Sequence, residues 1–241
     1  MNEDTKPNSK DVEPRSLRRG EKAGAAAATR LALLEAALTL FGSKGYDATT
    51  TREIAAAAGA NIASIAYHFG GKEGLRQACV EFIMTTMMQA SGMALATENV
   101  EGFARLGADE ARERLIATAE RFAVFLLDNP KAGLIVRFMS REIMAPSAAL
   151  DTIYARFLGP AHTRVCALWA AATGMDAESE ETRLLVFSLI GQAVYFRIAR
   201  EVIMRRMAWE TIGTREVALS TKVLLDNLNT MLDSHTGARD A

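Results

Sequence analysis

The most constraining feature of the chain is the stretch TTREIAAAAGANIASIAYHFGGKEGL at residues 50–75. Its first four residues predict a capping box, with Thr50 as the N-cap and Glu53 at the third helical position. The helix that starts there should end at Gly59, because glycine adopts the left-handed backbone conformation of a helix end at little cost. Asn61 is suited to cap a second helix directly after this turn. Two short helices joined so tightly predict a helix-turn-helix.

Helical patterns extend along the rest of the chain. Leu31, Leu34, Leu38 and Phe41 recur at spacings of 3, 4 and 3, which predicts a helix before the helix-turn-helix. Proline is limited to 5 residues, strand-favouring runs are rare and helix formers dominate. We therefore expect an all-α fold of about nine helices, with a loop at 98–108. The predicted helices cover residues 25–43, 50–58, 62–69, 72–95, 109–128, 132–144, 148–173 with a kink at 159–160, 179–207 and 214–233.

These helices group into a small N-terminal unit and a larger C-terminal one. Residues 1–22 are polar and charged and are expected to form a disordered arm, whose basic end could touch DNA or serve only as a solvated tail. Residues 23–71 should form a three-helix head that contains the helix-turn-helix. Residues 72–233 should form a larger helical body, and residues 234–241 a frayed tail.

The charge distribution limits what the head can bind and how. The formal net charge is −1, with +2 on residues 1–76 and −3 on the remainder. A nucleic-acid site must therefore be a local patch and not a basic domain. Cys79 and Cys166 lack metal-ligand spacing and are expected to be buried thiols in a reducing compartment. The longest uncharged run, residues 82–97, is too short and polar to span a bilayer, so a cytoplasmic protein without membrane contact is expected.

A helix-turn-helix can bind DNA by placing its second helix in the major groove. Ile54, Ile65 and Phe69 lie where they can fill the space between the short helices and the first helix, which leaves the opposite face of the second helix exposed. Thr51 and Lys72 lie at helix starts, where amide groups and positive charge favour phosphate. For His68 taken singly, an ordinary surface side chain is an equally good interpretation. For Lys72 taken singly it is the favoured one, and only the surrounding motif supports a role in DNA binding. The candidate DNA-binding residues are Thr50, Thr51, Arg52, Asn61, Ile62, Ala63, Ser64, Tyr67, His68 and Lys72.

Residues 50–75 as a whole resemble the DNA-binding segment of TetR-family transcriptional regulators. The family commonly has a tyrosine where Ala66 stands, so that phosphate contact should rest on Tyr67. The stretch 140–142 (SRE), the stretch 191–197 (GQAVYFR) and Trp209 resemble a narrower group within that family, the CecR/CerR-like regulators. The resemblance implies a homodimer with a ligand-binding body, joined to the head by the helix at 72–95.

Two sets of body residues are candidates for the functions that this resemblance implies. The last two helices carry apolar side chains on more than one side, so they must be covered on more than one side. The residues expected at a dimer interface are Leu185, Leu189, Val217, Leu224 and Leu228. An apolar wall with a few polar groups is typical of a small-molecule pocket, although such side chains are more often plain core. The candidate effector-pocket residues are Phe122, Phe125, Arg137, Phe138, Arg141, His162, Trp169, Gln192 and Phe196.

The favoured function is a repressor that binds a palindromic DNA operator as a homodimer and is released by an unknown small-molecule effector. An alternative is a DNA-binding architectural or interaction protein of the same fold that senses no ligand. An enzyme is not expected, because neither a Ser-His-Asp order nor a phosphate-binding glycine loop is present and the three histidines are scattered. No cofactor and no metal is expected. The mixed arginine, glutamate and histidine content of the pocket candidates would allow an anionic or zwitterionic effector.

Overall fold

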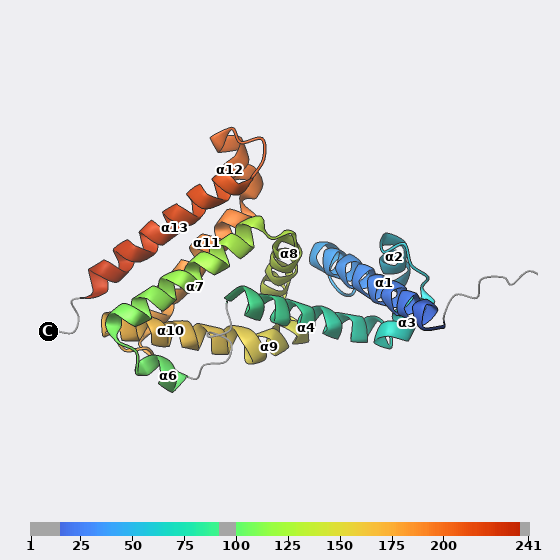
Figure 1. Ribbon diagram of the computed structural model, residues 1–241, viewed down its shortest axis with the longest axis horizontal. Helices are drawn as coiled ribbons and strands as arrows, with labels where there is room; N and C mark the ends of the chain where they lie inside the picture. The colour runs from blue at the N-terminus through green and yellow to red at the C-terminus, as the bar shows by residue number, and fades with distance from the viewer. Residues whose placement is uncertain (1–14, 92–99, 237–241) are drawn as a thin grey trace, which may run out of the picture.

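The computed structural model describes residues 15–91 and 100–236, and within these ranges it contains helices and no strand. The head lies at one end of the molecule and comprises α1 (Arg15–Lys44), α2 (Thr51–Ala57) and α3 (Ala63–Phe69), as Figure 1 shows. The predictions of an all-α fold and of a three-helix head are confirmed.

The long helix α4 (Lys72–Ser91) leads from the head into the body. The body is built around α7, which contacts α10 and α13, while α8 packs against α1 of the head. Its elements are α6 (Val100–Ala104), α7 (Ala108–Asp128), α8 (Pro130–Met144), α9 (Ala148–Ile153), the π-helical turn η1 (Tyr154–Leu158), α10 (Gly159–Thr173), α11 (Glu180–Ile198), α12 (Arg200–Met207) and α13 (Thr214–His235).

Both ends of the chain are more helical than predicted. Helix α1 begins at Arg15, so the expected arm is wrong for residues 15–22, and residues 1–14 lie outside the described range. Leucine, arginine, glutamate and lysine in that segment favour a helix, and one glycine does not prevent it. Helix α13 extends to His235, whose Nδ1 lies 2.7 Å from the Met231 carbonyl oxygen. The predicted tail is thus wrong at its first two residues, while residues 237–241 lie outside the described range.

Two internal predictions also need correction. Helix α6 lies within the expected loop at 98–108, because Phe103 is buried in the body core and anchors this short helix. The single helix expected over 179–207 is divided into α11 and α12, which are bent by 70° at Ala199. Neither glycine nor proline stands at this bend, so composition does not indicate it. The kink expected at 159–160 coincides with η1 and the start of α10.

The helix-turn-helix forms as its sequence predicts. The Thr50 hydroxyl accepts a hydrogen bond from the Glu53 amide at 3.2 Å, and the Glu53 carboxylate accepts one from the Thr50 amide at 2.8 Å. Gly59 has a φ of 62°, and the Asn61 side chain accepts a hydrogen bond from the Ala63 amide at 2.9 Å. Together these contacts fix the turn between α2 and α3.

The capping box should give the head a measurable acid sensitivity. Hydrogen bonds from Lys44 and from Thr50 lower the pKa of Glu53 from 4.5 to about 2. The stabilisation is therefore complete above about pH 4.5 and is lost as pH falls towards about 2. The difference in free energy of unfolding between wild type and Glu53→Gln should shrink over that range in urea titrations. A constant difference would contradict this, and Glu113→Gln on α7 serves as the control.

Part of the head helix also meets the length and composition of a membrane span. Residues 23–44 of α1 are long and apolar enough to cross a membrane, and so are α11 and α12 taken together, although these two are bent at their junction. The buried core helices of water-exposed proteins have the same length and composition. In α1 the side chains of Leu33, Leu38 and Phe41 are buried against the other helices of the head.

A candidate DNA interface and an apolar cavity

Helix α3 has one buried side and one exposed side. Ile65 is buried and Phe69 packs against the same core, one helical turn further along. Tyr67 is 82% exposed and Ile62 is 49% exposed, and Ala63 beside them is exposed too. Ile62, Ala63 and Tyr67, which are predicted to face DNA, therefore lie on the open side of α3 and of the turn before it, where nothing in the described chain covers them.

The remaining candidates lie around the two neighbouring helix starts. Arg52 is exposed in the first turn of α2, with Thr50 exposed before it and Thr51 half-buried. Ser64 and His68 are half-buried on α3. Asn61 is exposed and forms the turn.

Lys72 is held in place by an aromatic ring that sequence reasoning missed. Its Nζ lies 4.2 Å from the centre of the Tyr46 ring, and the Arg76 guanidinium lies at the same distance from that ring. Burial, followed by a hydrogen bond with Glu73, raises the pKa of Tyr46. The spacing of Lys72 and Arg76 places them on one side of α4, but nothing local indicates that Tyr46 lies beside both.

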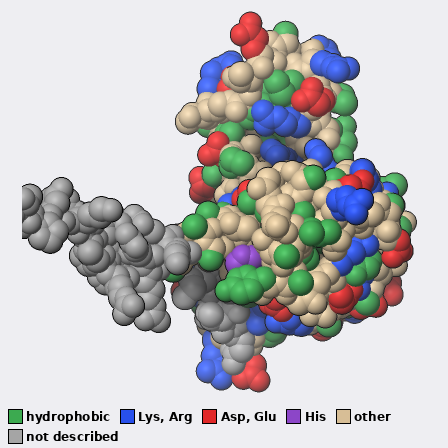
Figure 2. Space-filling view, turned by 90° about the vertical axis from the view of Figure 1, so that its right-hand side faces the viewer, with side chains coloured by type: hydrophobic (Ala, Val, Ile, Leu, Met, Phe, Trp, Pro, Cys, Tyr) green, Lys and Arg blue, Asp and Glu red, His purple; other side chains and the backbone are tan. Residues whose placement is uncertain are grey.

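The face of the molecule on the side of the head is not uniformly basic. Lysine and arginine side chains are scattered there among apolar and acidic ones, as Figure 2 shows. One lysine, Lys44, forms an ion pair with Glu53 at 2.6 Å.

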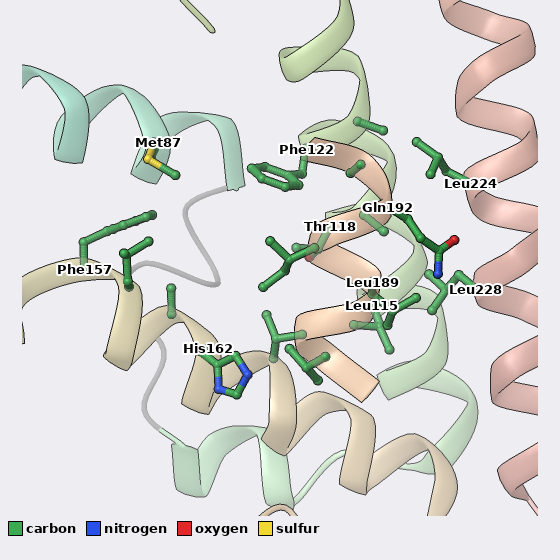
Figure 3. A pocket seen from close by; sticks show the side chains of 18 residues that line it. Met87, Leu115, Thr118, Phe122, Phe157, His162, Leu189, Gln192, Leu224 and Leu228 are labelled. Atoms are coloured by element: carbon green, nitrogen blue, oxygen red, sulfur yellow. The ribbon is translucent and has the colours of Figure 1, made fainter. Parts of the chain in front are cut away.

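The body contains a cavity of about 150 Å³ between α4, α7, η1, α10, α11 and α13, shown in Figure 3. Of the predicted effector residues, Phe122, His162 and Gln192 line it. None of the other fifteen lining residues was among the predicted pocket residues, since an apolar residue at helical spacing looks the same in a cavity wall and in a packed core. The full lining is Met87, Leu115, Thr118, Ala119, Phe122, Ala123, Phe157, Leu158, Ala161, His162, Val165, Val186, Leu189, Ile190, Gln192, Ala193, Leu224 and Leu228.

Six predicted pocket residues lie elsewhere. Trp169 is fully buried in the body core and donates a hydrogen bond to the Met175 sulfur. Arg141 donates a hydrogen bond to the Lys44 carbonyl at the end of α1, so it joins the body to the head. Arg137, on the same helix, lies so close to Gly42 of α1 that any side chain at position 42 would contact it. The other three, Phe125, Phe138 and Phe196, belong to the core that the head and body share.

The predicted dimer interface is wrong for three of its five residues. Val217, Leu224 and Leu228 are buried within the single chain, and Leu224 and Leu228 line the cavity. Leu185 and Leu189 are half-buried, and Leu189 lines the cavity as well. The sequence shows that these helices are apolar on several sides but not which side their own chain covers.

A different apolar stripe of α11 and α13 remains open. Its large side chains are between 41% and 68% exposed, and Gly191 lies among them with open space beside it. On α11 the spacing of 3, 4, 4 and 3 residues keeps the stripe on one side of the helix. The stripe comprises Leu184, Phe187, Gly191, Tyr195 and Ile198 of α11 with Leu219 and Val223 of α13.

Two family models match the chain in the same order as the head and the body. Residues 33–79 match the model of bacterial regulatory proteins of the tetR family. Residues 111–234 match the model of the C-terminal domain of the HTH-type transcriptional dual regulator CecR. The chain is 35% identical to the CecR regulator of Shigella flexneri over 201 residues, which cover 83% of this chain and 89% of that protein.

Solved structures show the same fold at low identity. AibR, in complex with isovaleryl coenzyme A and operator DNA, matches with a TM-score of 0.56 and 18% identity over 84% of this chain and 97% of that one. A TetR-like regulator from Rhodococcus sp. RHA1 matches with a TM-score of 0.55 and 17% identity over 92% and 99%. With its helix-turn-helix head and its CecR-type C-terminal domain, the chain belongs to the TetR family of DNA-binding transcriptional regulators.

Proposed function

We propose that the protein is a cytoplasmic repressor that binds a palindromic operator as a homodimer and leaves it when a small molecule enters the body cavity. The observation that carries this proposal is the position of α4. Lys72 begins this helix beside the DNA-facing side of the head, and Met87 near its other end lines the cavity. At about 1.5 Å per residue, α4 spans about 22 Å between these two residues.

The contacts of α4 support a mechanical connection between the two sites. Leu75, Cys79 and Ile83 are buried against the core that includes α1. Glu81 forms an ion pair with Arg156 of η1, and the next residue, Phe157, lines the cavity. A ligand that displaces Met87 or Phe157 would therefore tilt α4 and move the head attached to it. Such a ligand must favour one head position over the other, or the population would not shift.

The exposed stripe of α11 and α13 supports the dimer. A twofold axis through this stripe would pair two helices from each subunit and cover the apolar side chains that the single chain leaves open. The two α3 helices of such a dimer would occupy half-sites about 34–36 Å apart. AibR, which shares the fold, is seen with both a small molecule and operator DNA. The cavity also favours a ligand sensor over an architectural protein with a filled body.

Hydroxyl-radical footprinting on DNA from upstream of the protein's own gene tests this proposal. We expect two protected half-sites about one helical turn apart, and a promoter reporter should become more active when the gene is deleted. Reporter activity that falls on deletion would contradict repression. Protection at many unrelated sites would favour the architectural alternative.

The Tyr46 ring should contribute to operator affinity by positioning Lys72. A cation–π contact at an exposed site is worth about 0.5–1 kcal/mol, so Tyr46→Leu should lower affinity by about two- to fivefold. Tyr46→Phe keeps the ring and should retain nearly all of the affinity. Equal losses in fluorescence anisotropy for both variants would show that the hydroxyl matters instead.

A further inference from the structure

Among the described residues that line the body cavity there is no lysine, arginine, aspartate or glutamate. The pocket arginines expected from the sequence, Arg137 and Arg141, lie on α8 against α1 and not in this lining. Glu142 is buried and receives a hydrogen bond from the Ser147 hydroxyl at 2.6 Å, also away from the cavity. Of the lining residues that the structure describes, only Thr118, His162 and Gln192 have polar side chains.

His162 already uses both ring nitrogens. Its Nε2 lies 3.2 Å from the Arg183 carbonyl oxygen, which can only accept, so Nε2 carries the hydrogen. Its Nδ1 lies 3.6 Å from the Cys166 sulfur. Burial raises the pKa of the Cys166 thiol to about 11, so the thiol keeps its proton and can donate to Nδ1. The ring also stacks on Phe187 with 4.0 Å between centroids. Both ring nitrogens of His162 are therefore occupied, and neither is left to bind a ligand.

Gln192 is directed away from the cavity centre. Its amide points towards α13 in Figure 3, where its oxygen accepts a hydrogen bond from Asn227 at 3.1 Å. The aliphatic part of the side chain is what the cavity meets. Thr118 is the remaining polar group in the described lining, and the contact of its hydroxyl oxygen with Arg121 is long, at 3.5 Å. One hydroxyl is thus left to orient a ligand.

A ligand that enters such a cavity leaves water and becomes surrounded by apolar side chains. An ionised group would lose its hydration there without gaining an opposite charge, which strongly disfavours it. At about 10–15 Å³ for each ordered water, the cavity would hold roughly ten of them, which matches a compound of one or two rings or a medium alkyl chain. We infer that the effector is a neutral, predominantly apolar compound with few hydrogen-bonding groups. This inference rests on the proposed function of the cavity as the effector site.

Two dyes with one scaffold and different charge test the inference. Phenylnaphthylamine is neutral, whereas anilinonaphthalene sulfonate adds a sulfonate to the same rings. Fluorescence titration of the full-length protein should show the neutral dye binding roughly tenfold or more tightly than the anionic one. Ala161→Phe narrows the cavity from its wall and should abolish binding, while Ala155→Phe at an exposed position of η1 should not. Thr118→Arg adds a charge to the wall and should reverse the preference towards the sulfonate.

Circular dichroism of each variant separates loss of the cavity from loss of the fold. If Ala161→Phe proves unfolded, the preference of wild type for the neutral dye and the reversal of that preference in Thr118→Arg still test whether the cavity selects neutral compounds. No binding of the neutral dye, or equal binding of both dyes at a site sensitive to Ala161→Phe, would overturn the inference. Operator anisotropy measured with each dye present tests the switch separately. Neutral-dye binding that leaves DNA affinity unchanged would contradict effector release and leave the ligand class standing.

Discussion

Gly191→Arg is expected to convert the protein from a dimer into a monomer and to lower operator affinity by about 10²–10⁴-fold, the usual gain from binding two linked sites. Gly191 lies in the middle of the exposed stripe of α11, and a Cβ there meets no atom of its own chain within 4 Å. A bulky charged side chain would hold a second subunit away from the apolar residues on either side. Within the single chain the same change replaces a glycine in a helix interior and should stabilise it by about 0.5–1 kcal/mol.

Because Gly191→Arg should weaken the dimer but stabilise the single chain, loss of the dimer could not be attributed to unfolding. Sedimentation velocity would show whether the protein is a monomer or a dimer, and fluorescence anisotropy would give the affinity for operator DNA. Met144→Arg is the matched control, because Met144 is 85% exposed at the end of α8 and lies outside the stripe. A Gly191→Arg protein that remains dimeric would contradict the assignment of this face.

Gly74→Ala is expected to reduce operator binding by about a hundredfold or more, since recognition requires the helix to be held in its groove-binding orientation. A Cβ at Gly74, in the first turn of α4, would overlap the carbonyl oxygen of Phe69 at the end of α3. A backbone atom cannot move aside as a side-chain end does, so the junction between α3 and α4 must shift. That shift displaces Tyr67 and Lys72 together, and overpacking of this kind destabilises by about 1–3 kcal/mol.

Gly24→Ala in α1 is the control for this substitution. A Cβ at Gly24 meets nothing within 4 Å, so the change should leave DNA binding intact and stabilise the helix slightly. Thermal unfolding and anisotropy on both variants separate the two effects. Wild-type affinity in Gly74→Ala would show that the head tolerates movement of this junction.

The head was predictable because its signals are local. The capping box of Thr50 and Glu53 and the glycine turn at Gly59 each involve residues within a few positions of one another. The exposed side of α3 follows from the same pattern, since Ile65 and Phe69 can only face the core. Tyr46 beside Lys72 was missed because this contact joins residues 26 positions apart in the chain.

The body was predictable only in outline because its decisive features depend on long-range packing. Leu224 and Leu228 have the spacing of an interface stripe, yet α7 and the cavity occupy that side of α13. The bend between α11 and α12 has no local sequence signal at Ala199. Arg137 and Arg141 looked like pocket residues by composition, whereas contact between α8 and α1 assigns them to the junction of head and body.

The most direct test of operator binding is a fluorescence-anisotropy titration against DNA from upstream of the protein's own gene, at two salt concentrations. Wild type should saturate at two subunits per site, with an affinity that falls steeply as salt rises. Tyr67→Phe and Lys72→Ala should both weaken binding, and Lys72→Ala should reduce the salt slope by about 1. Lys131→Ala on α8, outside the head, should match wild type. Binding no tighter than to random DNA and indifferent to both head substitutions would contradict operator binding by the head.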